Sequence, residues 1–325
     1  MPSFSIVIPS FNRADVIERT LQQLAAQDYP ADRYELIVVD DSADATPDIV
    51  RRFAEDAKFP VRLIDDCRCI PAIKRNVGLA AATGDYVLFM NDDAWCEPDL
   101  LAEHARTHAS WTEPVAVLGR VEQSPEMPRS AFLDWYRPFA YHLLREYANK
   151  PVPYYFCWSM NLSLPRERML SEGITFHEQW SEIGHEDVEL GYRWIKAGHQ
   201  VIYNPSALSI HYHPHTLRSA CRLQESIGRG LRDLERRIPE PRLLERYGVF
   251  SWRNTPRAVA RGLARHALVN DVTGPLLENW LSRQQRNTPL SRWLYWKVLL
   301  RHTDRGYRSP CPLSLWERVG VRAFL

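Results

Sequence analysis

Long apolar runs are missing from this chain of 325 residues. No stretch approaches the roughly 18 apolar residues that a membrane-spanning helix needs, and the longest candidate, residues 293–300, is interrupted by Lys297. The first nine residues read as a β-strand rather than as a basic segment followed by an apolar one, so we expect no signal peptide. These absences favour a cytoplasmic protein.

Cysteine pairs with metal-binding spacing are also absent. None of the six cysteines forms a C-x-x-C motif, and Cys67 with Cys69 alone cannot complete a four-ligand zinc site. We therefore interpret the cysteines as scattered buried thiols in a reducing compartment. The segment after the first predicted strand, Pro-Ser-Phe at residues 9–11, contains no glycine. This argues against a sugar nucleotidyltransferase, which needs a glycine-rich phosphate loop at that place.

An excess of one charge is missing from the chain as a whole, because 41 Lys and Arg nearly balance 40 Asp and Glu. The balance hides an asymmetry. Residues 1–223 hold 22 basic and 31 acidic residues, a net charge of −9, whereas residues 224–325 hold 19 and 9, a net charge of +10. A basic C-terminal region is typical of proteins that meet an anionic surface or ligand.

Two interpretations of this basic region stay open. In the first it is a solvated helical face, with Arg257, Arg261 and Arg265 on one side, that packs its aromatic residues onto the rest of the chain or forms a homo-oligomer. In the second it attaches the protein peripherally to the anionic inner face of a membrane. The tryptophans that would then lie at the lipid interface are Trp280, Trp293, Trp296 and Trp316. We expect no nucleic-acid partner, because no known reading module is present.

The first half of the chain alternates β-rich runs with helical patterns. The runs cover residues 4–8, 36–39, 61–64 and 86–90, and helical spacing appears over residues 14–27 and 71–82. Repeated strand–helix–strand units predict an α/β fold with a mainly parallel sheet and helices on both faces. Ligands of such sheets bind beyond the carboxyl ends of the strands. The residues that follow each predicted strand are therefore candidates for a site.

Beyond residue 94 the pattern is mixed. We expect helices over 97–109 and 186–197 and strands over 115–121, 201–203 and 208–212. From about residue 216 the chain reads as helical, Arg-rich and Trp-rich. The last segment, residues 308–325, has two prolines and little periodicity, which predicts poor order.

Acidic residues follow two of the predicted strands. Asp40 and Asp41 come after the second strand, and Asn91, Asp92 and Asp93 come after the fourth. Carboxylates gathered at one sheet edge repel one another unless a cation or sugar hydroxyls lie between them. Two adjacent carboxylates at a strand end are typical of Mg²⁺ or Mn²⁺ sites. The alternative is a turn that caps the next predicted helix.

Histidines and a third acidic pair occur further along the chain. His211 and His213 are two residues apart, so on a strand they would point the same way, and imidazole suits Mn²⁺ or Zn²⁺. Histidines clustered by chance on a surface strand are the alternative. Glu186 and Asp187 begin the predicted helix over 186–197, where they could also simply complement the helix dipole.

The order of these motifs resembles the family 2 glycosyltransferases, which have the GT-A fold, a Rossmann-like sheet flanked by helices. The resemblance rests on residues 5–13, 37–42, 72–93, 160–166, 184–193 and 203–205. It covers about the first 215 residues, and the last 110 lie outside it. We therefore divide the chain into a glycosyltransferase domain over 1–215, a basic helical region over 216–307 and a tail over 308–325.

The resemblance implies roles for individual residues. Asp187 would be the general base, held in place by Glu186. Asp93 would bind the divalent metal, Mn²⁺ or Mg²⁺, with His211 as the further ligand and His213 as the other candidate. The donor nucleotide would contact Pro9, Ser10, Asn12, Arg13, Asp40, Asp41, Arg75, Asn91 and Asp92.

The function that follows is an inverting transfer of a sugar from a nucleoside-diphosphate sugar, by default a UDP-sugar, to a hydroxyl of a carbohydrate or glycoconjugate acceptor. Such enzymes build bacterial-type cell-surface polysaccharides and glycoconjugates. The first acid of the family's D-x-D element is replaced by Asn91, a departure that the element tolerates. One alternative is a catalytically degenerate sugar-nucleotide-binding protein, which we would expect to have lost Asp93 or Asp187. A metal-dependent hydrolase is the other, although residues 211–216 lack the extra Asp of its usual histidine clusters.

Overall fold

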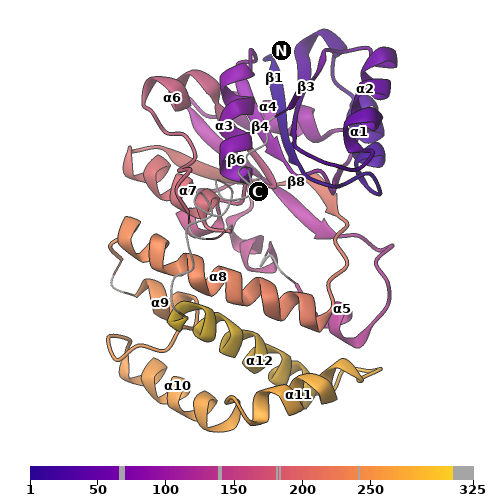
Figure 1. Cartoon of the computed structure of the whole chain (residues 1–325). Helices are drawn as coiled ribbons and strands as arrows, with labels where there is room; N and C mark the ends of the chain where they lie inside the picture. The colour runs from indigo at the N-terminus through magenta and orange to yellow at the C-terminus, as the bar shows by residue number, and fades with distance from the viewer. Residues whose placement is uncertain (66–69, 138–140, 181, 183, 241, 310–325) are drawn as a thin grey trace, which may run out of the picture. The chain divides into compact units, whose positions relative to one another are not determined.

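The structure is a computed structural model that describes residues 1–65, 70–137, 141–180, 182, 184–240 and 242–309 (Figure 1). It divides into two compact units. The sheet unit comprises Met1–Pro125, Phe139–Glu178 and Glu186–Tyr212, and the helical unit comprises Glu126–Pro138, Gln179–His185 and His213–Leu325. No helix among the described residues is long and apolar enough to span a membrane. The tail predicted to be poorly ordered lies outside the described residues from residue 310 onward.

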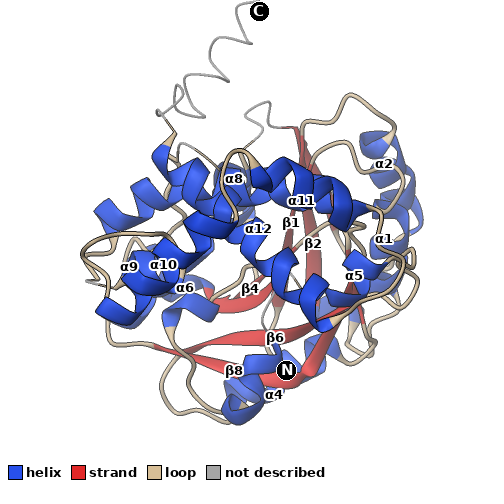
Figure 2. Cartoon of the chain, turned by 90° about the horizontal axis from the view of Figure 1, so that it is seen from below, coloured by secondary structure: helices blue, strands red, loops and turns tan. Residues whose placement is uncertain are grey.

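The strands of the sheet unit form one sheet of eight strands within the described residues (Figure 2). They are β1 (Phe4–Ser10), β2 (Tyr34–Asp40), β3 (Val61–Asp65), β4 (Tyr86–Met90), β5 (Ala94–Cys96), β6 (Val115–Gln123), β7 (Asn161–Pro165) and β8 (Gln200–His211). Their order across the sheet is β3-β2-β1-β4-β7-β6-β8-β5. Strands β1 to β4 pair in parallel, and antiparallel pairs follow where β7 meets β4 and β6. The predicted α/β fold is confirmed.

Helices connect and cover these strands. They are α1 (Ile17–Ala25), α2 (Thr46–Asp56), α3 (Pro71–Ala81), α4 (Leu100–Ala109), α6 (Arg166–Ser171) and α7 (Glu186–Lys196), with short 3-10 helices η1 (Ala31–Arg33), η2 (Tyr141–Tyr147) and η3 (Tyr154–Phe156). Parallel strands connect by right-handed crossovers. The chain moves outward from β1 through β2 to β3 and then back to β4, so α3 lies on the opposite face from α1 and α2 (Figure 1).

Strands β1 and β2 are interior strands of the sheet and read as almost continuous apolar runs because both of their faces are buried. Helix α3 packs closely on β1 at Gly78. A Cβ atom at this position would lie 2.2 Å from Val7 Cγ1, which no side chain could tolerate without a shift. Glycine therefore lets the helix approach the strand, and the approach fixes where the first turn of α3 meets the strand ends.

Strand β8 is one continuous element, so the prediction of two separate strands is wrong. Its pairing with β6 shifts from Gly119–Asn204 to Arg120–Leu208, which leaves residues 205–207 as a bulge. A proline in the bulge interrupts the apolar alternation and cannot donate to a neighbouring strand. The buried Asn161 amide donates to the bulge carbonyl of Ala207 at 3.0 Å. The bulge is therefore satisfied by a distant side chain that local patterning could not reveal.

The helical unit consists of α5 (Ala131–Trp135), α8 (Leu217–Arg237), α9 (Leu243–Arg246), α10 (Pro256–Leu268), α11 (Thr273–Ser282) and α12 (Pro289–Arg308). The long helices α8 and α12 lie side by side (Figures 1 and 2). They cross at two glycines. A Cβ at Gly228 would lie 2.0 Å from the Thr303 carbonyl oxygen, and one at Gly306 would lie 2.1 Å from that of Glu225. The helices are thus in backbone contact, around an apolar core that includes Tyr295.

Candidate functional site

The carboxyl ends of the parallel strands meet at one edge of the sheet. Strand β1 ends at Ser10, which lies in register with Asp40, the last residue of β2. Pro9 precedes it and pairs with Val39. The fourth strand ends at Met90 on the other side of β1. The structure therefore gathers the segments that follow β1, β2 and β4, as the sequence predicts.

The turn after β1 is held against the turn after β2. Asn12 has a φ of 54°, a left-handed conformation that asparagine adopts more readily than most residues. Its backbone N–H donates to Ser42 Oγ at 2.6 Å, and its side-chain oxygen accepts from the Ala43 N–H at 3.0 Å. Asp40 accepts from the Ser42 hydroxyl at 2.6 Å and from the Ser42 N–H at 3.0 Å. In this structure the Asp40 carboxylate anchors a turn.

Arg13 connects this turn to the acidic segment after β4. Its backbone N–H donates to Thr46 Oγ1 at 2.8 Å, at the start of α2. Its side-chain Nε lies 3.0 Å from Asp92 Oδ1, and its Nη2 donates to Asp93. Burial alone would lower the pKa of Arg13, but the two carboxylates raise it above its ordinary value. The guanidinium is therefore the cation that compensates the buried acidic pair.

The acidic segment is a turn between two strands and does not cap a helix. Strand β5 follows it directly, and α4 begins only at Leu100 after Asp99, so the capping alternative is wrong. Asn91 is partly buried and its carbonyl accepts from the Ala94 N–H at 3.3 Å. Burial and the charge of Asp93, only partly offset by Arg13, raise the pKa of Asp92 to about 6. Such a pair favours a further cation.

His211 lies against this acidic pair. It is the last residue of β8, and its Nε2 lies 3.3 Å from Asp93 Oδ1. The partner strands on both sides stop there, since His211 pairs with Ala94 and Gln123 at their ends. His213 therefore lies two residues beyond the end of the strand. It belongs to the helical unit.

Two adjacent cations on the first turns of α3 contact different parts of the site. Lys74 Nζ donates to the Ser10 carbonyl at 2.5 Å and pairs with Asp41, and both side chains are almost fully buried. Arg75 Nη1 lies 3.0 Å from Glu186 Oε1. The sequence analysis does not name Lys74 as a site residue. It could have been recognised as a lysine at a buried position of the helix, because a buried lysine requires a carboxylate partner.

Asp187 lies next to the Arg75–Glu186 pair, at the start of α7. Its carboxylate accepts from the Ser159 N–H at 3.2 Å and from the Val188 N–H at 2.8 Å. Burial and the neighbouring Glu186 carboxylate raise the pKa of Asp187 to about 7, although Arg75 opposes the rise. A carboxylate whose pKa lies near neutrality can take and release a proton under physiological conditions.

The oxygen and nitrogen atoms brought together suit a divalent cation. Carboxylate oxygens are the preferred ligands of Mg²⁺ and Mn²⁺, and an imidazole nitrogen suits Mn²⁺. Asp93 and His211 already approach each other within the sheet unit, and Asp92 is adjacent. The residues present therefore fit the cation that the sequence predicts.

Comparison with known proteins decides the family. Residues 5–166, about half of the chain, match the model of glycosyl transferase family 2. The chain belongs to this family. A validoxylamine A glucosyltransferase from Streptomyces hygroscopicus subsp. jinggangensis is 28% identical in an alignment over 219 residues that covers 59% of this chain and 51% of that protein. This family 2 chain thus spans about half the length of that curated relative.

Solved structures show the same fold. The mannosyltransferase PcManGT from Pyrobaculum calidifontis, solved with GDP-Man and Mn²⁺, matches with a TM-score of 0.64 at 23% identity and covers 94% of this chain and 87% of its own. Residues 1–349 of Staphylococcus aureus TarS, solved with UDP-GlcNAc, match with a TM-score of 0.53 at 19% identity, covering 94% and 91%. Both likenesses extend beyond residue 215.

Proposed function

We propose that this family 2 chain is an inverting glycosyltransferase that moves a sugar from a nucleoside-diphosphate sugar to an acceptor hydroxyl. The observation that carries the proposal is Asp187, a carboxylate with a pKa of about 7 in the same unit as the acidic pair after β4. A carboxyl group whose pKa is raised toward neutrality can still lose its proton at neutral pH and can accept a proton in the transition state. The family membership supports the same reaction.

The donor nucleotide would bind at the carboxyl edge of the sheet. The turn at Asn12 and Arg13 offers backbone groups and a guanidinium, and the segment after β2 offers Asp41 beside Lys74. We propose that Pro9, Ser10, Asp40, Arg75, Asn91 and Asp92 complete this pocket, with Asp40 acting through the turn that it anchors. Ligands of open α/β sheets bind at this edge.

The cation would be held by Asp93 and His211, and Asp92 would contact the cation or the ribose. Mn²⁺ or Mg²⁺ bound there would act as a Lewis acid that neutralises charge on the departing diphosphate. Without the cation, Arg13 neutralises the same two carboxylates. Arg13 would therefore release at least one of them and become available to a donor phosphate, which a guanidinium binds well.

Asp187 would take the proton of the acceptor hydroxyl as that oxygen attacks the anomeric carbon. The bond from that carbon to the diphosphate breaks in the same displacement, so the configuration inverts and the proton ends on Asp187. Burial and then the charge of Glu186, which pairs with Arg75, raise the pKa of Asp187 as this role requires. The chemistry requires the base to lie within about 3 Å of the hydroxyl.

The first test is a thermal-shift panel of UDP, dTDP, GDP and CDP, each with and without Mn²⁺. A ligand that binds only the folded state raises apparent stability. We expect a Mn²⁺-dependent shift with one nucleotide, with UDP as the default. If no nucleotide shifted the unfolding temperature of the folded protein, the result would count against the proposal and favour a metal-dependent hydrolase or a catalytically degenerate protein.

The second test replaces Asp187 by Asn, which keeps the shape of the side chain and removes the base. Transfer should fall by about 10²- to 10⁴-fold, while the nucleotide shift stays as in the unaltered protein. Asp48→Asn, at an exposed position on α2, is the matched control and should transfer at the ordinary rate. Transfer by Asp187→Asn at the ordinary rate would refute the assignment of the base.

The acceptor is proposed only as a class. A carbohydrate or glycoconjugate hydroxyl fits the family, and a role in cell-surface polysaccharide or glycoconjugate synthesis is the corresponding expectation. Peripheral attachment to an anionic membrane and a homo-oligomer stay predictions. Trp280, Trp293 and Trp296 are between 43% and 47% exposed in the helical unit, as either of these predictions requires.

A further inference from the structure

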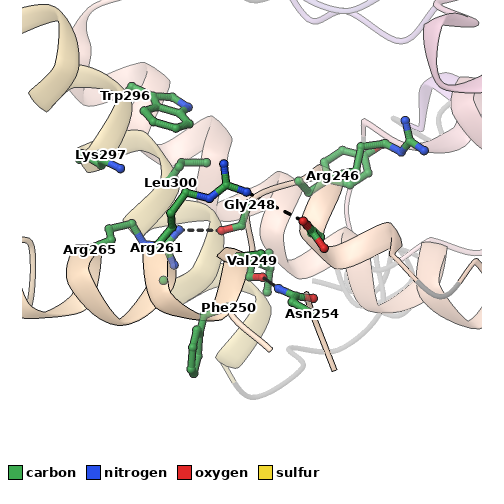
Figure 3. Close-up of a pocket in the computed structure, with 14 residues that line it drawn as sticks. Arg246, Gly248, Val249, Phe250, Asn254, Arg261, Arg265, Trp296, Lys297 and Leu300 are labelled. Atoms are coloured by element: carbon green, nitrogen blue, oxygen red, sulfur yellow. Dashed lines mark hydrogen bonds and ion pairs between the residues drawn. The ribbon is translucent and has the colours of Figure 1, made fainter. Parts of the chain in front are cut away.

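The helical unit contains a cavity of about 230 Å³ between the segment after α9 and the helices α10 and α12 (Figure 3). Its charged lining is unbalanced. Arg246, Arg261, Arg265 and Lys297 contribute four cationic side chains, and Glu245 contributes one carboxylate. Arg246 is paired with Glu240 at 2.8 Å, which leaves three cations and one carboxylate to be accounted for.

Arg265 is the buried member of this group, with 4% of its surface exposed. Its Nη1 donates to the Gly248 carbonyl at 2.6 Å, a contact visible in Figure 3. Its Nε and Nη2 have no hydrogen-bond partner among the described residues. A buried donor without an acceptor is costly, because folding removes the water that it would otherwise bind. Two nitrogens of one buried guanidinium that lines the cavity therefore lack a hydrogen bond.

The nearest carboxylate does not satisfy this guanidinium. Asp304 Oδ1 lies 3.6 Å from Arg265 Nη2, beyond hydrogen-bond distance. Its oxygens already accept from Arg308 Nε at 2.9 Å and from the Phe250 N–H at 2.9 Å, and His266 Nε2 lies 3.2 Å away. One carboxylate is shared among several donors, so positive charge remains on the cavity side.

The other two cations are also weakly compensated. Arg261 Nη2 has Glu245 Oε1 at 3.9 Å, too far for a hydrogen bond. Lys297 Nζ lies 4.4 Å from the centre of the Trp296 ring, a cation–π contact that supplies no hydrogen-bond acceptor. Burial and then the charges of Arg265 and Arg261 lower the pKa of Lys297, as expected for cations that lie close together.

The backbone around the cavity is held in place by two glycines. Gly248 has a φ of 69°, a left-handed conformation, and directs its carbonyl to Arg265. Gly262 on α10 lets the Phe250 ring approach, since a Cβ there would lie 2.4 Å from Phe250 Cδ2. Positions fixed in this way keep the guanidinium and the cavity preorganised for a ligand.

We propose that this cavity is a binding site for a phosphate group, carried by a soluble phosphate ester or by a lipid headgroup. A guanidinium presents parallel N–H donors that match two oxygens of one phosphate. A phosphate monoester also brings close to two negative charges. It can therefore balance the three cations better than the single carboxylate of Glu245 can. The cavity volume of about 230 Å³ accommodates such a group, because it is several times the volume of about 30 Å³ that one water molecule takes in the liquid. The site lies wholly within the helical unit and does not depend on the proposed transfer.

The test uses the full-length protein and calorimetric titration with inorganic phosphate and glycerol 3-phosphate at constant ionic strength. Arg261→Gln and Lys297→Gln remove cavity cations at positions that are not fully buried, so both variants should fold. Arg257→Gln removes an exposed cation from the same helix outside the cavity and is the matched control. We expect each cavity variant to weaken phosphate binding at least tenfold and the control to change it less than twofold.

A second arm separates the two sources of the phosphate. Vesicles with phosphatidic acid carry a phosphate monoester on a lipid, and vesicles of phosphatidylcholine alone are the reference. Binding of free phosphate that is lost in the cavity variants indicates a soluble ligand. Sedimentation with phosphatidic acid vesicles alone, lost in the cavity variants and retained in Arg257→Gln, indicates a lipid headgroup. Binding in neither arm, or equal losses in all three variants, would overturn the proposal.

Discussion

Arg75 Nη1 lies 3.0 Å from Glu186 Oε1, and both side chains are buried. This ion pair joins α3, which packs on β1 and β2, to the first residue of α7. Glu186 and Asp187 are adjacent in the chain, so one guanidinium compensates two neighbouring carboxyl groups. The ion pair therefore controls both the position and the charge of the proposed base.

Replacing Arg75 by Met should raise the pKa of Asp187 above its value of about 7, because the cation that opposes the rise is lost. We expect the acidic limb of the pH–rate profile for transfer to move up by about one unit or more. At pH 7 a rise of one unit corresponds to about fivefold less of the deprotonated base. Arg51→Gln, on the exposed face of α2, should leave the profile unchanged. If the acidic limb of the pH–rate profile did not move in Arg75→Met, the ionisation that governs the rate would not be that of Asp187.

Arg13 and a divalent cation should compete for Asp92 and Asp93, since the guanidinium contacts both carboxylates. Arg13→Gln should therefore be less stable than the unaltered protein without metal. Added Mn²⁺, without nucleotide, should stabilise the variant more than it stabilises the unaltered protein, because no guanidinium has to be displaced. Thermal unfolding over a Mn²⁺ series with a final chelator step measures both effects. A smaller Mn²⁺ shift in the variant would contradict this competition.

Glu35 is predicted to make stability depend on pH. Its carboxylate accepts from Ser5 Oγ at 2.6 Å, from the Thr83 N–H at 2.7 Å and from Arg62 at 2.6 Å. Burial would raise the pKa of Glu35, but these contacts lower it below the usual 4.5. The stabilisation is therefore present above about pH 4.5 and lost as the pH falls through the lower folded-state pKa.

Glu35→Gln should accordingly lower the free energy of unfolding by about 1–3 kcal/mol at pH 7, the usual range for hydrogen bonds to a charged group. The difference between variant and unaltered protein should shrink as the pH falls below about 4.5. Urea unfolding at pH 7 and at pH 4 would measure it. A difference that stays constant with pH would show that packing rather than charge makes the contribution.

Gly228→Ala tests the backbone contact between α8 and α12. Alanine is the better helix former by about 1 kcal/mol, so propensity alone predicts stabilisation. The Thr303 carbonyl, only 2.0 Å from the added Cβ, predicts destabilisation by about 1–3 kcal/mol instead. Arg222→Ala, on the exposed side of α8, is the control and should stay within about 0.5 kcal/mol. A stabilised Gly228→Ala protein would mean that the two helices are further apart than described.

Much of the sheet unit could be predicted from the sequence because its signals are local. The apolar runs predicted strands β1 to β4 close to their true positions, and the helical spacing over residues 14–27 predicted α1. Parallel strands have their carboxyl ends at one edge, so the polar segments that follow them had to gather there. The family resemblance was confirmed for the same reason, since its motifs are those segments.

Other features depend on partners far apart in the chain. The Ala207 carbonyl in the bulge of β8 accepts a hydrogen bond from Asn161. Strand β8 ends at His211 because its pairing with β5 and β6 ends there. Neither feature could be recognised from residues 200–213 alone. The role of Lys74 is similar, because the lysine becomes explicable only when Asp41 and the Ser10 carbonyl surround it.

The sequence by itself determined which residues carry charge and which strand each acidic segment follows. Hydrophobic periodicity and the geometry of parallel strands are enough for that. Only the tertiary structure decided how those charges are compensated: Arg13 by Asp92 and Asp93, and Arg75 by Glu186. It also decided that Arg265 keeps two unsatisfied N–H groups beside a cavity. Compensation depends on distances of about 3 Å between side chains remote in sequence, and packing alone sets such distances.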